Sequence, residues 1–402
     1  MKNYRTIHIW DFPANYTFVR VKESFRRQLI EKAINKFGNE PKLVAYISNR
    51  STFYKIKRDL SRGMFYNWAK GYRISKGNNI TANMPLWVVI EISRILSDSN
   101  SLNNENMVEL ERNIEYYCSS GPASRVYNPK LPILVTPELI SLVFHFFGDG
   151  HMSTRPQVMS SYRQMNKIGL DNFHNKLKNC FGSFKISKGQ MKDGKLHVPK
   201  IITETLKKYF NIDKSNWHDA RIPDSIKGMS KNHLLAGLTA FIIDEGNVAE
   251  IIEIYSKNYN LLNDIRKVAL KCGYDCKDIR KKFRYGVFDS YRFLISSNSY
   301  LRLNNDILEL EREFPLCGLA HKTKRFNIMV KRKRRNFRTE KEGVTKRKIL
   351  ALLKEKTRTI SEFVEILNIG NSSVREHLWR LEKDNKIIRK GTNGRNIIWS
   401  IK

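Results

Sequence analysis

Two stretches, LVFHFFGDG (residues 142–150) and LTAFIIDEG (residues 238–246), decide how this 402-residue chain is expected to fold. Each is an apolar run that ends in an acid and a glycine, with Asp149 closing the first and Glu245 closing the second. Thr136, which is followed by a proline and an acid, predicts the start of a helix before the first stretch. A closing glycine lets the backbone leave a helix in a new direction. The sequence therefore predicts two apolar helices, each with one acid at its C-terminal end.

The same order of elements follows each acid, so the region from about 131 to 325 is predicted to be an internal repeat. Short strands come first, then an amphipathic helix, then basic strand-like segments, and finally another helix. In the first copy, about 131–212, these are 160–162, 169–182, 185–198 and 200–210; in the second, about 230–325, they are 254–256, 259–274, 281–296 and 299–310. Each copy has the predicted order α-β-β-α-β-β-α.

Both stretches, the second preceded by LLAGL (residues 234–238), resemble the paired LAGLIDADG motifs of monomeric homing endonucleases. The resemblance covers about half of the chain. It implies an α+β core with pseudo-twofold symmetry, in which the two motif helices pack side by side. Close approach of two helices needs small side chains, which Ala236, Gly237 and Ala240 supply. One chain with two motifs also predicts a monomer, because the repeat replaces the twofold axis of a dimer.

The two stretches depart from the family motif at three positions. Phe144 and His145 stand where the first helix usually has small residues. We expect the small face of the second helix to accommodate this bulk. Ile243 replaces the earlier aspartate of the motif, a position that usually has a structural role.

The resemblance implies a metal-dependent nuclease site. Asp149 and Glu245 would be its catalytic and metal-binding residues, holding Mg²⁺, with Mn²⁺ as a substitute, against the scissile phosphates. In this family each acid helps to direct cleavage of one DNA strand. Lysines often assist near the metals, and Lys195 and Lys322 are the candidates here. An acid at a helix C-terminus is electrostatically unfavourable, so two acids placed alike argue for a compensating cation.

The strands of each repeat are implied to form a curved sheet in the major groove of double-stranded DNA. Some of their polar side chains would reach bases or phosphates. The candidates are Gln157, Arg163, Lys185, Lys188, Gln190 and Lys192 in the first repeat, and Tyr255, Lys257, Arg280, Lys282, Arg284 and Tyr285 in the second.

The composition indicates a polyanionic partner. Lysine and arginine number 73 against 39 acids, a formal net charge of +34, and proteins that neutralise phosphates gain affinity by releasing counterions. An anionic membrane is the alternative, but no apolar run is long enough to span a bilayer and we expect no signal peptide. Five scattered cysteines fit a reduced compartment. We therefore expect a cytoplasmic protein, associated with the nucleoid if the host is a prokaryote.

Residues 345–402 have the pattern of a winged helix. Three helical segments, the last beginning near Asn371, precede two strands around the turn Thr-Asn-Gly at 392–394. The candidate DNA contacts are Ser372, Ser373, Arg375 and Arg380 on the recognition helix, and Arg389, Lys390 and Arg395 on the wing. A winged helix that contacts a protein is the alternative.

The remaining segments have weaker patterns. Residues 1–120 predict a helical domain of helix-turn-helix type, with one helix over 20–37 and a buried helix near Pro85, although a plain helical bundle fits equally well. A polar stretch with prolines before residue 131 predicts a linker. Residues 326–344 predict a second linker, which is strongly basic.

Three functions remain open at this point. The first is a site-specific double-strand DNA endonuclease of homing type, which the presence of both acids favours. The second is a domesticated LAGLIDADG transcriptional regulator that binds DNA without cutting it, which the flanking modules favour. The third is an RNA-splicing maturase, since the same core occurs in such proteins and the positive charge also suits RNA.

Overall fold

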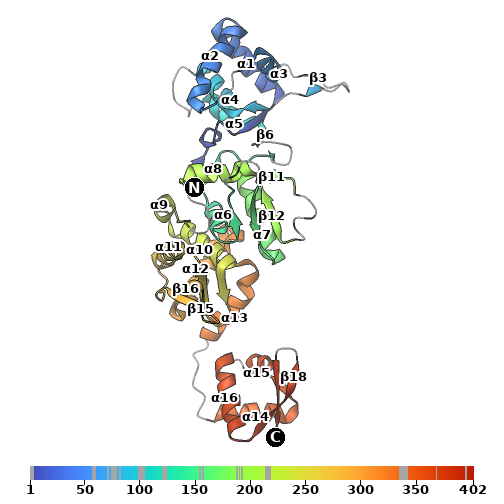
Figure 1. Ribbon diagram of the computed structural model, residues 1–402, viewed down its shortest axis with the longest axis vertical. Coiled ribbons are helices and arrows are strands. Elements are labelled where there is room, and N and C mark those ends of the chain that lie inside the picture. Colours follow the sequence, from blue (N-terminus) through green and yellow to red (C-terminus); the bar gives the residue numbers. More distant parts are fainter. Residues whose placement is uncertain are drawn as a thin grey trace.

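The computed structural model describes residues 4–56, 60–69, 72–73, 79–80, 83–97, 105–119, 125–153, 155, 158–186, 189, 191, 193–212, 219–334, 343–367, 369–393 and 396–402. Helices and several small sheets alternate through these residues, so the chain has a mixed α+β fold. Figure 1 shows three parts in chain order along the long axis: an N-terminal part, a central part with two repeats, and a C-terminal part.

The N-terminal part is not the purely helical domain that the sequence suggested. Its helices are α1 (Glu23–Phe37), α2 (Glu40–Arg50), α3 (Arg62–Ala69), α4 (Leu86–Leu96) and α5 (Glu105–Arg112). They lie beside a five-stranded sheet with the order β11-β7-β6-β2-β5, made of Ser183–Phe184, Val126–Tyr127, Ile114–Cys118, Phe18–Val21 and Met84–Pro85. The expected helix over 20–37 starts only at Glu23, because Val19 and Val21 alternate into the core as a strand.

The predicted linker before residue 131 also contains structure. Strand β7 lies in that linker, and it pairs with β11 of the first repeat. Strand β1 (Thr6–Ile7) pairs with β8 (Ile133–Leu134), far away in the sequence. The N-terminal part and the first repeat therefore share a sheet and are not separated by a free tether.

The predicted element order is found in both repeats. The first consists of α6 (Pro137–Phe147), β9 (Gly150–His151), β10 (Ser160–Arg163), α7 (Lys167–Phe181), β11, β12 (Lys195–Val198) and α8 (Lys200–Phe210). The second, after the short α9 (Asp224–Lys227), consists of α10 (Lys231–Glu245), β13 (Gly246–Val248), β14 (Ile252–Ser256), α11 (Tyr259–Lys271), β15 (Arg280–Arg284), β16 (Val287–Ile295) and α12 (Tyr300–Glu313).

The sheets of the two repeats have matching topology. In the second repeat the order is β13-β14-β16-β15, and in the first the equivalent strands follow as β9-β10-β12. The fourth strand of the first repeat, β11, instead joins the N-terminal sheet. Two copies of one supersecondary unit thus make up the central part.

Helices α6 and α10 pack against each other along the interface between the repeats. Thr136 caps α6 by accepting a hydrogen bond from the backbone N–H of Leu139 at 3.4 Å. The bulky Phe144 fits because it faces Gly237, where an added Cβ would lie 2.6 Å from the aromatic ring. The expected accommodation by the second helix is therefore present.

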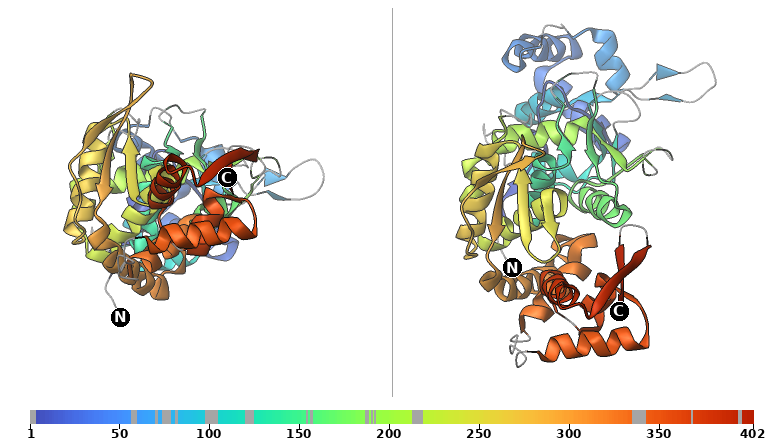
Figure 2. Two further views of the ribbon diagram at one scale, coloured as in Figure 1. Left: turned by 90° about the horizontal axis from the view of Figure 1, so that it is seen from below. Right: turned by 60° about the horizontal axis from the view of Figure 1, so that its bottom comes forward.

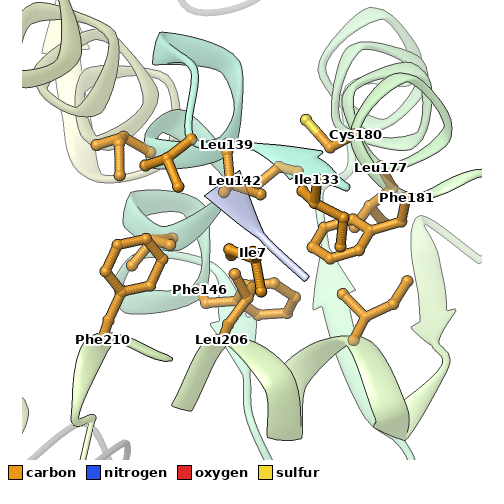
Figure 3. Packing of buried hydrophobic residues seen from close by; sticks show 14 of the residues in the cluster. Ile7, Ile133, Leu139, Leu142, Phe146, Leu177, Cys180, Phe181, Leu206 and Phe210 are labelled. Atoms are coloured by element: carbon orange, nitrogen blue, oxygen red, sulfur yellow. The ribbon is translucent and has the colours of Figure 1, made fainter. Parts of the chain in front are cut away.

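One hydrophobic core extends from the N-terminal part through both repeats. Figure 3 shows where the first repeat meets the chain start: Ile7 of β1 and Ile133 of β8 lie among apolar side chains of the helices α6, α7 and α8. The basic segment after the second repeat belongs to this core as well. Helix α13 (Thr323–Arg334) buries Phe326, Met329 and Val330, so the first half of the predicted linker 326–344 is an ordered helix.

The C-terminal part has its own hydrophobic core. Its elements are α14 (Val344–Glu355), β17 (Arg358–Thr359), α15 (Ile360–Leu367), α16 (Asn371–Lys383), β18 (Ile387–Asn393) and β19 (Asn396–Ile401), with the sheet order β17-β19-β18. This is the order of elements in a winged helix, with α16 in the place of the recognition helix. Throughout the described residues, no helix has the length and apolar character needed to cross a bilayer.

Candidate functional site

The two acids of the repeated motif lie at the ends of the paired helices. Glu245 is the last residue of α10, and Asp149 follows α6 in the turn before β9. Burial, together with repulsion from Asp244 and Glu245, raises the pKa of Asp149 to about 8. Burial and the charge of Asp244 likewise raise the pKa of Glu245 to about 7. The structure therefore brings one acid from each repeat into a single electrostatically strained cluster.

Asp244 is a third member of this cluster, and the sequence analysis missed it. Its carboxylate is fully buried and contacts the Nδ1 atom of His145 at 3.0 Å. The Tyr162 hydroxyl donates to it at 2.7 Å, and the backbone N–H of Asp149 donates at 3.4 Å. Gly148 leaves room for this carboxylate, because a Cβ there would lie 2.6 Å from its oxygen. Asp244 thus links the second repeat to the first.

A buried lysine completes the polar chain between the repeats. Lys176 of α7 donates through Nζ to Ser141 Oγ at 2.7 Å and lies 3.0 Å from His145 Nε2. Burial, and then the charge of Lys176, holds the pKa of His145 far below its usual value, so the imidazole is neutral. It then accepts from the lysine and donates from Nδ1 to Asp244. His145, which seemed too bulky for the motif, therefore connects the buried Lys176 with Asp244, whose pKa is raised to about 7 by burial.

Lys322, one of the two candidate lysines, lies at this cluster. Its Nζ donates to the carbonyl of Ile242 at 2.8 Å and to the carbonyl of Gly246, so it caps the C-terminal end of α10. Burial lowers its pKa, while the three nearby carboxylates oppose that shift. Lys195 lies exposed on β12, and among the described residues it does not contribute to the pKa shift of either acid.

The donor chemistry of the cluster suits a hard divalent cation. Asp149 Oδ2 accepts a hydrogen bond from Gln164 Nε2 at 3.2 Å, which fixes one carboxylate oxygen. Because burial and mutual repulsion raise the pKa values of these carboxyl groups, a cation such as Mg²⁺ would favour their ionised form and would be held through their oxygen atoms. Within the described residues no three histidine, cysteine or acidic side chains are grouped to hold a metal on their own. Phosphate oxygens would have to complete the coordination.

The candidate contacts of the second repeat gather on one face of its sheet. Arg280 and Lys282 are two residues apart on β15 and therefore point to the same side, and Arg284 follows an irregularity in the pairing with β16 between Lys282 and Phe283. Lys282 Nζ lies 4.2 Å from the ring centre of Tyr255, which stands on β14. Arg284 lies over the ring of Tyr285 at 5.6 Å. The remaining candidate, Lys257, is exposed just after β14.

The first repeat presents fewer candidates. Arg163 ends β10 and Lys185 follows β11, and both are exposed. The other four predicted contacts, Gln157, Lys188, Gln190 and Lys192, lie outside the described residues, as does Arg395 of the wing.

The recognition helix of the C-terminal part is exposed and polar. The predicted contacts Ser372, Ser373, Arg375 and Arg380 on α16 and Arg389 and Lys390 on β18 are all solvent-accessible. Arg389 is partly neutralised, since its Nε lies 2.9 Å from Glu382. Sequence reasoning missed Trp379, which is 57% exposed on α16 and lines a groove of about 440 Å³ between the helix and the wing. The apolar residues Val374, Leu378 and Leu381 recur at intervals of four and three, and this pattern could have shown that Trp379 lies off the buried face of the helix.

The comparisons with known proteins identify one part of the chain. The model of the helix-turn-helix family described as "Bacterial regulatory protein, arsR family" matches residues 343–385, which contain α14, α15 and α16. No curated protein matches the chain. The C-terminal part is therefore an arsR-type helix-turn-helix domain, which implies DNA binding, and the match does not extend over the two repeats.

Proposed function

We propose that this protein binds a specific site on double-stranded DNA and acts as a transcriptional regulator. The observation that carries this proposal is the arsR-type domain, whose exposed helix α16 presents Arg375 and Arg380 beside a basic wing. Such a helix enters the major groove and reads base edges, while nearby cations contact phosphates. The basic face of β15 in the second repeat extends the same interaction, and the net charge of +34 favours encounter with DNA.

The test is selection of a target from random duplexes by the full chain, followed by titration at several salt concentrations. Arg375→Ala should weaken binding by roughly tenfold or more and relax base preference at one position. Lys354→Ala is the matched control, because this exposed lysine lies on α14 and not on the recognition helix. Equal losses in both variants, or no preferred sequence, would contradict site-specific reading by α16.

A second candidate function is metal-dependent cleavage of the bound DNA by a LAGLIDADG-type core. The observation that favours it is the pair Asp149 and Glu245, one from each of two topologically matching repeats, at the ends of packed helices. These two carboxylates would hold Mg²⁺, which supplies an activated water and stabilises charge on the scissile phosphate. Gln164 orients Asp149, and Lys322 limits repulsion between the acids.

One experiment separates the regulator from the nuclease. The selected target, in plasmid form, is incubated with the full chain with and without Mg²⁺, alongside Asp149→Asn and Glu245→Gln. Mg²⁺-dependent double-strand cuts that become nicks or vanish in the variants would establish the endonuclease. If all three proteins bind the target equally and none cuts it, the result would favour the regulator. Tighter binding to a structured RNA competitor would instead favour the maturase.

A further inference from the structure

The tip of the β15–β16 hairpin exposes more apolar surface than a solvated turn requires. Tyr285 is 93% exposed, Val287 70%, Phe283 58% and Phe288 42%. Clustered exposed apolar side chains of this kind mark interaction sites. Figure 2 shows the hairpin extending beyond the rest of the second repeat, so these side chains stand at its outer end.

The turn itself places an aromatic ring where a small residue is usual. Tyr285 has φ 51° and the following Gly286 has φ 79°, the left-handed pair of a tight hairpin turn. Asparagine, aspartate or glycine occupies the first of these positions at lowest conformational cost, whereas a bulky residue with positive φ is uncommon. The backbone is therefore strained at Tyr285, and the ring of this residue lies at the most exposed point of the hairpin.

The charges beside the tip favour a polyanionic partner. Four of the five residues of β15 are basic: Arg280, Lys281, Lys282 and Arg284. A second copy of this chain carries the same excess of positive charge and would be repelled. A nucleic acid duplex offers both complements, phosphates for the cations and flat apolar base faces for the ring. Arg284, stacked over Tyr285, brings one cation next to the ring that would meet the bases.

We infer that Tyr285, with Val287 beside it, inserts as a wedge between neighbouring base pairs of the bound duplex. This inference rests on the proposed DNA binding and goes beyond it, because it assigns a mechanical effect to the hairpin tip. An inserted side chain unstacks one base step and bends the helix axis by roughly 20–90°. Pyrimidine–purine steps unstack most easily, so such a step is expected under the tip.

The experiment uses the full chain and its selected target, with 2-aminopurine placed at successive positions and a fluorophore pair at the duplex ends. Wild type should raise 2-aminopurine fluorescence at one step and increase energy transfer between the ends. Tyr285→Ala should abolish both effects and weaken binding by roughly tenfold, since base stacking on one ring has about that value. Tyr285→Phe keeps the ring and should retain both effects.

Tyr259→Ala is the control, because Tyr259 is 48% exposed at the start of α11 and not at the tip. Fluorescence and energy transfer that persist in Tyr285→Ala would overturn the wedge while leaving DNA binding intact. The absence of any preferred target for wild type would instead refute the proposed function, and the wedge with it.

Discussion

Replacing Lys176 by methionine should destabilise the central part strongly, because it removes the cation of the buried chain between the repeats. Lys176 is fully buried and lies 3.0 Å from His145, which in turn lies 3.0 Å from the buried carboxylate of Asp244. Removing one charged member of a buried network costs about 3–5 kcal/mol when the other charge stays buried without compensation, and here the neutral His145 relays the interaction between Lys176 and Asp244. Methionine preserves most of the side-chain volume, so the packing contribution is small.

The lower end of this range applies, because Lys322 also acts on Asp244 and partly replaces the lost cation. A loss of about 3 kcal/mol corresponds to a decrease of about 6 °C in the unfolding temperature of a unit this large. Calorimetry of the full chain measures this value on the transition of the part that contains both repeats. Lys178→Met, at an exposed position of α7, is the matched control and should change stability by less than about 0.5 kcal/mol.

A double variant tests whether charge is the cause. Lys176→Met combined with Asp244→Asn removes both ends of the chain, so its loss should be smaller than the sum of the two single losses by about 1 kcal/mol or more. If Lys176→Met shifts the unfolding temperature no further than Lys178→Met, the cation does not neutralise Asp244, and our account of the interface is wrong.

Three further variants test other parts of the structure. Gly237→Ala should lower the free energy of unfolding of the repeats by about 1–3 kcal/mol in calorimetry, because its Cβ would meet the buried ring of Phe144 at 2.6 Å. Unchanged stability would contradict tight packing between α6 and α10 at this position. Burial alone would raise the pKa of Asp264, but hydrogen bonds from Arg221 lower it, so this carboxylate stabilises the fold above about pH 4 and the effect is lost as the pH falls further. Asp264→Asn should therefore be less stable than wild type at pH 6, and thermal unfolding should show the difference shrinking below pH 4, whereas a constant difference would exclude the charge as its source. Leu378→Ala should lower the free energy of unfolding of the winged helix by about 2–5 kcal/mol in calorimetry and leave that of the repeats unchanged. An equal decrease for the repeats would show that the two cores unfold together.

The repeats were predictable because each element has a local sequence pattern. The cap at Thr136, the acid-glycine ends and the alternation of apolar residues each depend on a few neighbouring positions. The winged helix was predictable for the same reason, and its helices agree with the matched family. Both helices of the motif interface were also foreseen, together with the need for a small residue opposite Phe144.

The N-terminal sheet escaped prediction because its pairing is non-local. Strand β2 has four residues, and Phe18 pairs with Cys118, which lies far away in the sequence. Periodicity cannot detect so short a strand, and nothing in the neighbouring sequence names its partner. Helix α13 was missed for another reason, since Phe326, Met329 and Val330 have helical spacing within a segment dominated by positive charge.

The candidate site was only half predictable. Asp149 and Glu245 follow from the motif, and the structure places Lys322 beside them. Asp244 required knowledge of the register between α6 and α10, because its partner His145 belongs to the other helix and its role appears only when the two helices face each other. Which acid lies inside the interface therefore depended on packing and not on the pattern of either helix alone.

The pairing of β1 with β8 has a consequence for how the protein is made. Thr6 pairs with Leu134, so the first strand has no partner until the ribosome has synthesised the start of the first repeat. At ordinary rates of synthesis this interval is roughly 6–25 s. During that time Ile7, which is fully buried in the folded protein, lacks its partner strand. Strand β1 thus completes its pairing only after β8 has been synthesised, and until then the segment around Ile7 is a target for a chaperone that binds apolar side chains.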